Sequence, residues 1–232
     1  MDATVLEREI YSDTEAAAIL RVPVSTLRWW LDGGIRAGRE YQPVIRPAPT
    51  GRRTVTWAEF IEAGLLRQYR RDLGVKLSEL RQFIDLLRER TGLPYPLAHF
   101  LPAVGEGAKL ILELQTEAGL PGDLWLVART DQLIWTPVAQ DFMRRVDWDH
   151  ERPRAWRPHN DEGSPVRCSP VHRFGRPAIK GISTDAIVEH LAAGEDEEDV
   201  ASQFDLNVSD VRWAQAFELS SKQQSEPGAE AA

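Results

Sequence analysis

Apolar positions recur at helical spacing through much of the first ninety residues. Between residues 11 and 33, two short apolar stretches are separated by Val22 and Pro23, and a residue that precedes a proline avoids helical backbone angles. Ser12 with Glu15 three residues later is typical of a capping box, which predicts that the first helix starts there. The pattern therefore predicts two short helices with a tight bend between them, as in the helix-turn-helix that reaches into a DNA groove.

The second of these helices has polar side chains opposite its apolar residue Leu27. The hydroxyl groups of Ser25 and Thr26 and the guanidinium of Arg28 suit phosphate oxygens and base edges. These side chains favour DNA recognition by this helix. The alternative is an ordinary helical hairpin whose outward arginine is only solvated.

Two short segments rich in β-forming residues follow, at residues 41–45 and 54–57, with prolines and a glycine between them. They predict a two-stranded β wing that carries Arg46, Arg52 and Arg53 near its tip. Arginines at a wing tip are well placed to contact a phosphate backbone or a minor groove. The alternative is an exposed turn whose charges only aid solubility.

Helical spacing resumes after Thr56, whose hydroxyl can cap a helix that ends at Gly74. A further amphipathic helix follows. It cannot run far past Thr91, because Pro94 and Pro96 break it.

The pattern changes in the next section, residues 96–150. Residues 109–114, 124–128 and 132–138 resemble strands separated by turns, and residues 139–146 fit a short helix. The sequence predicts a β-rich platform for dimerisation or for a partner.

Residues 151–165 are polar and rich in proline, which predicts a linker. Beyond it, residues 166–221 are expected to form a second helix-turn-helix module that begins with an extended basic arm. Three short helices should follow, the first capped by Ser183 or Thr184 and the third capped by Ser209. Residues 222–232 are rich in Gln, Ser, Glu and Ala and are expected to be disordered.

The fold class expected from these patterns is mainly α with small β elements, that is, α+β. The expected domains are a winged helix-turn-helix at 8–95, the β-rich section at 96–150, the linker at 151–165, the C-terminal module at 166–221 and the tail at 222–232.

Charge divides unevenly along the chain, whose net charge is −8. Residues 21–90 hold 14 Lys and Arg against 8 Asp and Glu, whereas residues 101–232 hold 13 against 23. Residues 183–221 alone carry ten carboxylates and one arginine. A basic front part suits nucleic acid, and acidic helices repel phosphate, so the C-terminal module is expected to bind a protein or to dimerise.

Composition narrows the remaining classes. No apolar run approaches the length of a membrane span, and the N-terminus lacks the pattern of a secretory signal. Cys168 is the single cysteine, so an intramolecular disulfide is excluded, and a cytoplasmic location is expected.

Residues 11–90 resemble the winged-helix DNA-binding domain of MerR-type regulators. The resemblance rests on Tyr11, Glu15, Ala16, Ala17, Val22, the run Thr26-Leu27-Arg28-Trp29-Trp30, Arg53, Thr56, Leu65 and the run from Gly74 to Arg81. It implies that Arg28, Trp30 and Arg53 hold the DNA backbone. Pro23 replaces the family's usual capping serine and Val55 replaces a wing tyrosine. The family's long dimer helix is forbidden here by Pro94 and Pro96.

Residues 169–218 resemble a short C-terminal winged-helix module found in VapB-type antitoxins. The matching residues are the run from Gly175 to Gly181, Ala193-Gly194-Glu195, Val200-Ala201 and positions from Leu206 through Val211 to Ala216. A segment after Gly181 is shorter than is usual in that module. The two resemblances together imply an antitoxin that represses its own promoter and neutralises a PIN-like ribonuclease toxin. A homodimer is expected because helix-turn-helix motifs usually read two half-sites.

Three other functions were weighed against this one. The second choice is a MerR-like regulator that senses a small effector; a protein-interaction scaffold is the third. An enzyme is not expected, because no P-loop, dinucleotide loop, zinc-protease motif or nucleophile elbow is present. His150, His159, Cys168 and His172 could in principle hold zinc, but their spacing matches no standard finger, so neither a metal nor a cofactor is expected.

The residues expected to contact DNA are Arg21, Ser25, Thr26, Arg28, Trp30, Arg46, Arg52 and Arg53. A second contact or partner surface is expected at Arg173, Arg176, Lys180, Arg212 and Trp213.

Overall fold

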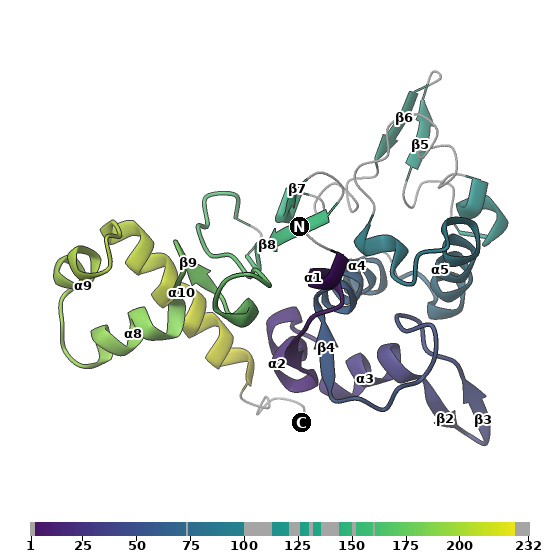
Figure 1. Cartoon of the computed structure of the whole chain (residues 1–232), viewed down its shortest axis with the longest axis horizontal. Helices are drawn as coiled ribbons and strands as arrows, with labels where there is room; N and C mark the ends of the chain where they lie inside the picture. The colour runs from purple at the N-terminus through teal and green to yellow at the C-terminus, as the bar shows by residue number, and fades with distance from the viewer. Residues whose placement is uncertain are drawn as a thin grey trace, which may run out of the picture. The chain divides into compact units, whose positions relative to one another are not determined.

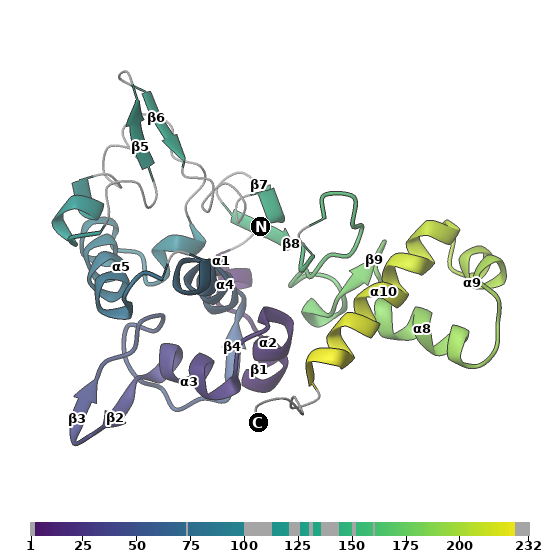
Figure 2. The same ribbon diagram turned by 180° about the vertical axis from the view of Figure 1, so that it is seen from behind.

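The structure is a computed structural model, which describes residues 3–72, 74–99, 113–120, 126–129, 132–135, 144–149, 152–159 and 161–225. Its contacts divide the chain into two compact units, Met1–Arg154 and Ala155–Ala232. Both units combine helices with short antiparallel strand pairs, in agreement with the expected α+β class (Figures 1 and 2). No helix in the part of the chain that the structure describes is long and apolar enough to span a membrane.

The N-terminal unit begins with small elements around a three-helix core. In order, these are α1 (Ala3–Leu6), β1 (Glu9–Ser12), α2 (Asp13–Leu20), α3 (Val24–Asp32), β2 (Gly34–Arg36), β3 (Arg39–Tyr41), β4 (Thr54–Thr56), α4 (Trp57–Asp72), α5 (Leu77–Thr91) and the 3₁₀ helix η1 (Pro96–Ala98).

The two expected helices and the bend between them are confirmed as α2 and α3. Ser12 and Glu15 form the capping box that starts α2, and the side-chain oxygen of Ser12 accepts the backbone N–H of Glu15 at 3.2 Å. Arg21 ends α2 in the left-handed conformation, with φ 56°. Pro23 is the N-cap of α3, whose first helical residue is Val24.

The β wing is in a different place from the one expected. Strand β4 pairs antiparallel with β1, far back in the sequence, and not with residues 41–45. The hairpin instead consists of β2 and β3, joined by a two-residue turn at Ala37 and Gly38 that both have positive φ. This is the geometry of a type I′ turn, which matches the twist of two paired strands.

The core of this unit lies between α2, α3 and α4, which pack against one another. Ala16 and Ala17 are fully buried in α2, and their small side chains let the neighbouring helices approach closely. The Phe60 ring lies 4.8 Å from the ring of Tyr11 and 5.5 Å from that of Trp57. Each buried side chain of this size contributes about 1.5–3 kcal/mol to stability.

Helix α4 begins with the expected cap. The hydroxyl of Thr56 accepts the backbone N–H of Glu59, and the Glu59 carboxylate accepts the N–H of Thr56 in return. Helix α5 ends at Thr91, as expected, with Gly92 in the left-handed conformation. The chain then turns back, and η1 packs against both α4 and α5.

The last section of the N-terminal unit, residues 96–150, is only partly described. The strands β5 (Leu126–Arg129) and β6 (Gln132–Trp135) form an antiparallel hairpin, which confirms two of the three strands expected there. Residues 113–117 are helical, so the end of the strand expected at 109–114 is wrong, and residues 109–112 lie outside the described part. Of the short helix expected at residues 139–146, residues 144 and 145 are helical, Val146 instead starts a strand, and residues 139–143 are not described.

The expected linker contains a strand. β7 (Val146–Asp149) pairs with β8 (Arg152–Trp156), and the chain passes from one unit to the other within β8. The indole N–H of Trp57, at the start of α4, donates to the carbonyl of Pro153 at 2.6 Å. The boundary between the two units thus falls within the expected linker, but the first part of that segment is an ordered strand with a contact to a residue ninety-six positions earlier.

The C-terminal unit is a small helical module. Its elements are η2 (Arg173–Gly175), β9 (Ala178–Ile179), β10 (Ile182–Ser183), α8 (Thr184–Ala192), α9 (Glu197–Gln203) and α10 (Val208–Ser225). The three helices were expected, and the expected arm contains η2 and β9, whose strand pairs with β10.

Helix caps and one compact cluster of apolar side chains stabilise this unit. Asp196 caps α9 through the N–H groups of Glu198 and Asp199, and Asn207, not Ser209, caps α10 through the N–H of Asp210. Helix α10 continues to Ser225, so the expected disorder is wrong for residues 222–225, and residues 226–232 lie outside the described part. The buried cluster comprises Val166, Ile179, Ile187, Val200, Ala201, Val211, Ala214 and Phe217.

Candidate DNA-binding surface

A buried carboxylate joins the two arginines on which the expected DNA contact depends. Asp13 is only 3% exposed and accepts a hydrogen bond from Arg28 Nε at 2.6 Å and from Arg53 Nη1 at 3.5 Å. The backbone N–H of Asp13 also donates to the carbonyl of Arg53 at 2.7 Å. The helix α3 and the segment before β4 therefore present their arginines side by side.

Both guanidinium groups remain accessible although they share this anchor. The side chain of Arg28 is 43% exposed and that of Arg53 is 68% exposed. The hydrogen bond from Arg28 lowers the pKa of Asp13 below its usual value, although burial acts in the opposite direction. Asp13 thus stays ionised and neutralises only part of the positive charge, which leaves a net cationic edge next to α3.

Ser25 and Trp29 form a ridge along α3, because residues four apart lie on the same face of a helix. On one side of this ridge lies an open hollow of about 400 Å³, which we call the Arg53 hollow. On the other side lies a second hollow of about 410 Å³, which we call the Arg36 hollow. The Arg53 hollow is lined by Ser25, Arg28, Trp29, Asp32, Gly33, Gly51 and Arg53, and the Arg36 hollow by Ser25, Thr26, Trp29, Trp30, Arg36, Arg70 and Leu77.

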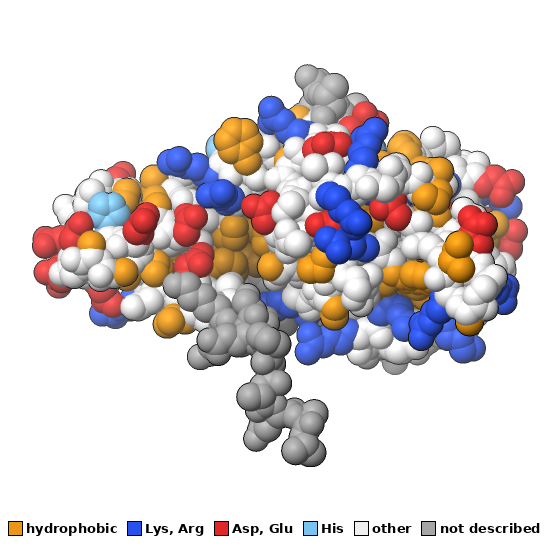
Figure 3. Space-filling model, turned by 90° about the horizontal axis from the view of Figure 1, so that it is seen from below, with side chains coloured by type: hydrophobic (Ala, Val, Ile, Leu, Met, Phe, Trp, Pro, Cys, Tyr) orange, Lys and Arg blue, Asp and Glu red, His pale blue; other side chains and the backbone are white. Residues whose placement is uncertain are grey.

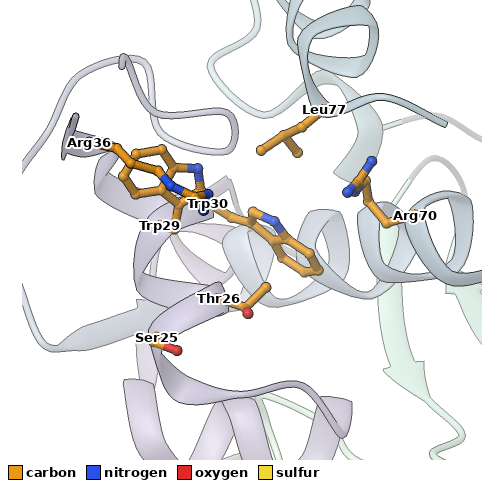
Figure 4. Close-up of a pocket in the computed structure, with 7 residues that line it drawn as sticks. All are labelled: Ser25, Thr26, Trp29, Trp30, Arg36, Arg70 and Leu77. Carbon is orange, nitrogen blue, oxygen red and sulfur yellow. The ribbon is translucent and has the colours of Figure 1, made fainter. Parts of the chain in front are cut away.

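Figure 4 shows how the Arg36 hollow is assembled from three parts of the chain. The serine, threonine and tryptophans lie on α3, Arg36 reaches in from the hairpin, and Arg70 and Leu77 come from α4 and α5. Arg70 is held in place because its guanidinium donates to the carbonyl of Val75. Arginines therefore lie on both sides of the ridge formed by Ser25 and Trp29.

Arg46 does not lie on this surface, so its expected contact with DNA is wrong. The side chain is only 2% exposed. Its Nε donates to Glu59 at 2.8 Å, and Nη1 lies 2.9 Å from both carboxylate oxygens of Asp32. Arg46 also donates to the hydroxyl of Thr50 and to the carbonyl of Thr54, so it fixes the loop to the ends of α3 and α4.

Asp32 completes this buried network from the end of α3. Its carboxylate accepts the backbone N–H groups of Thr50 and Gly51, at 2.8 and 3.2 Å. Burial alone would raise the pKa of Asp32, but these hydrogen bonds and the Arg46 guanidinium lower it below the usual value. The loop that carries Arg53 is therefore locked to α3 through ionised groups.

Trp30 is also less available than expected. Its side chain is 5% exposed, and its carbonyl accepts the N–H groups of Val44 and Ile45. The buried indole leaves Trp30 able to support α3 but not to lie along a phosphate backbone, which corrects the expected contact.

The other expected DNA contacts lie at the surface. Arg21 is exposed at the bend between α2 and α3, and Ser25 and Thr26 lie in the first turn of α3. Arg52 is exposed and pairs with Glu9 at 3.1 Å. The structure brings Ser25, Arg28 and Arg53 together around one hollow, whereas Arg52 points to the β1 edge.

The cations expected to form a second contact surface are engaged within the C-terminal unit. Arg173 donates to the carbonyl of Gly181, Arg176 pairs with Asp185, Lys180 with Asp210 and Arg212 with Glu197, while the Trp213 ring lies 5.5 Å from that of His159. In Figure 3, acidic side chains gather over the helical end of this unit, whereas basic and acidic side chains are interspersed over the N-terminal unit. Among the described residues, no group of three or more His, Cys, Asp or Glu could hold a metal, and His150 lies outside them.

Several contributors to the surface were not among the predicted contacts, including Asp13 as the shared anchor, Trp29, Arg36 and Arg70. Asp13 directly follows the capping residue Ser12, and this position does not predict its contacts with two arginines. Arg36 precedes an Ala-Gly pair between two short β-forming stretches, and that local hairpin signal could have revealed it. No sequence signal pairs Asp13 with Arg28, because the contact joins separate helices.

Comparisons with known proteins extend over both units. Residues 166–217 match a family model described as "Protein of unknown function (DUF433)". The chain is 28% identical over 221 residues to "Uncharacterized protein Rv2308" of Mycobacterium tuberculosis, with 90% of each chain covered. The X-ray crystal structure of Rv2018 from the same species is similar with a TM-score of 0.71 and 25% identity, over 90% of this chain and 98% of that one.

The two similarities that cover 90% of this chain include residues of both units. None of the three descriptions names an activity or a ligand. A function for this chain therefore has to be argued from its own surface.

Proposed function

We propose that the chain is a double-stranded DNA-binding regulator of transcription in which α3 enters the major groove. The observation that carries the proposal is the Asp13 anchor, which sets Arg28 and Arg53 beside the exposed ridge of α3. In this arrangement the two guanidinium groups bind phosphate oxygens along one strand, and Ser25 at the ridge reads base edges. The excess of Lys and Arg over Asp and Glu in residues 21–90, on a chain that is acidic as a whole, supports the same orientation.

Salt dependence of binding tests the proposal directly. We expect the protein to bind a duplex that spans the region upstream of its own gene, with an affinity that falls steeply as salt rises. Arg53→Gln should lower the slope of log affinity against log salt by about one, and Arg28→Gln should do the same, with a loss of about tenfold in affinity for each. Fluorescence anisotropy at several salt concentrations measures both quantities.

The matched control removes one positive charge elsewhere in the same unit. Arg90 is half exposed at the end of α5 and pairs with Glu117. Arg90→Gln should leave the slope unchanged. Because Arg28→Gln leaves Asp13 with one partner, circular dichroism should first show that every variant is folded. Equal slopes for Arg53→Gln, Arg90→Gln and the unchanged protein would refute the proposed surface.

The second expected role, neutralisation of a PIN-like toxin, is proposed for the C-terminal unit. Its support is that four of its cations are held by its own carbonyls or carboxylates, which leaves acidic helix faces suited to a basic protein partner. Helix α5 ends at Thr91 and η1 packs back on it, so α5 itself is too short for the dimer helix of an effector-sensing MerR-like regulator.

Co-expression provides the test of this second role. If a PIN-like nuclease is encoded next to this chain, we expect the two proteins to co-purify and the nuclease to lose its ribonuclease activity. Residues 155–232 should be necessary for both effects. Full inhibition of the nuclease by a chain in which Glu197 and Glu198 are replaced by lysine would argue against an acidic docking surface.

A further inference from the structure

The hairpin β2–β3 carries two arginines that form no ion pair with any residue that the structure describes. Arg36 and Arg39 are directly opposite each other at the end of the hairpin, and both are exposed. Within the described residues, neither guanidinium has a carboxylate or a hydrogen-bond acceptor, and Arg39 contacts only the Tyr41 ring, 5.4 Å away. Like charges directly opposite on paired strands are destabilising, so the fold gains nothing from this pair.

The two faces of this hairpin differ in character. Because side chains alternate along a strand, Gly34, Arg36, Arg39 and Tyr41 share one face, and Ile35 and Glu40 share the other. The arginine face is the one turned to α3. The Tyr41 ring lies 5.5 Å from that of Trp29, and a Cβ added at Gly34 would lie 3.4 Å from the Trp29 ring.

The contact with Trp29 fixes the direction of the arginines. Gly34 and Tyr41 lie against the indole, so the hairpin packs on the ridge of α3 and Arg36 forms part of the wall of the Arg36 hollow. Arg70 forms part of the same wall from α4. Two guanidinium groups from separate elements thus converge on a hollow about as large as the one beside Arg28 and Arg53, on the other side of the ridge.

We propose that hairpin β2–β3 is a second DNA-binding element, in which Arg36 and Arg39, together with Arg70, bind phosphates of the strand opposite to the one held by Arg28 and Arg53. The proposal rests on the proposed entry of α3 into the major groove. Phosphate oxygens are anionic, lie along both borders of that groove and accept the fork of donors that a guanidinium presents. In the complex, DNA phosphates supply Arg36 and Arg39 with the anionic partners that the described part of the free protein does not provide.

The test separates the two faces of the same hairpin. Arg36→Gln and Arg39→Gln should each reduce affinity for the upstream duplex about threefold to tenfold, and together they should lower the salt slope by about two. Ile35→Ser and Glu40→Gln change the opposite face and should alter affinity by less than about twofold. Hydroxyl-radical footprinting should show protection lost on one strand for Arg36→Gln and on the other strand for Arg53→Gln.

The outcomes of these binding experiments distinguish failure of the proposed function from failure of the hairpin proposal. If the unchanged protein binds no duplex in a salt-dependent way, the proposed function and this inference both fall. If Arg53→Gln weakens binding while the hairpin variants do not, only the hairpin proposal falls. A larger loss with Ile35→Ser than with Arg36→Gln would also overturn it, since the hairpin would then enter a groove by its apolar face.

Discussion

Replacing Arg46 with alanine should lower the free energy of unfolding of the N-terminal unit by about 3–5 kcal/mol, because loss of one partner from a buried ion pair leaves the other charges uncompensated. In this protein the charges left behind are Asp32 and Glu59, and Glu59 is 3% exposed. The Thr54 carbonyl also loses its donor. Urea unfolding followed by circular dichroism measures the change.

Two further variants make this prediction specific. Arg52→Ala removes an exposed neighbour that pairs with Glu9 at the surface, and it should change stability by less than about 1 kcal/mol. Arg46→Lys keeps the charge but not the fork of donors, so its loss should be intermediate. Equal unfolding midpoints for Arg46→Ala and Arg52→Ala would contradict the role assigned to Arg46.

Stability of the N-terminal unit should fall as pH rises from about 5 to about 8, because of Glu62. This side chain is fully buried in α4 and accepts the backbone N–H of Leu97 at 2.9 Å. Burial is the main cause that raises its pKa from 4.5 to about 8, and the positive charge of Arg88 opposes the rise only in part. In this pH window the folded protein keeps a proton that the unfolded chain has released, so unfolding becomes easier as pH rises.

The variant Glu62→Gln isolates this effect. The glutamine cannot ionise. Between pH 5 and pH 8.5, the unfolding free energy of the unchanged protein should therefore fall by on the order of 2–4 kcal/mol relative to that of the variant. Taking the difference cancels groups that titrate alike in both proteins. Urea midpoints measured at several pH values provide the data, and parallel pH profiles for the two proteins would show that Glu62 is not protonated in the fold.

What could be predicted from the sequence was local. Ser12 and Glu15 lie within one helical turn, and Pro23 acts on its own neighbour, so the helices α2 and α3 and the bend between them were accessible to pattern analysis. The same holds for the end of α5 at Thr91. In each case the residues that determine the structure are within a few positions of one another.

What could not be predicted depends on partners distant in the sequence. β4 was assigned to a wing with residues 41–45, but its strand partner is β1, more than forty positions earlier. Arg46 and Arg53 are seven positions apart in similar surroundings, and only the fold decides that one is buried between Asp32 and Glu59 and the other is exposed. Sequence alone gives both residues the same charge and the same expected role.

The lock formed by Arg46 has a consequence for the choice of operator. Since Thr50 and Gly51 are tied to Asp32, the spacing between the loop arginine and α3 is set before any duplex arrives. If this rigid surface binds phosphates as proposed, the DNA has to change its shape to fit the fixed spacing between Arg53 and α3. Selectivity would then extend to base pairs that no side chain touches, through how readily each sequence adopts the required groove width.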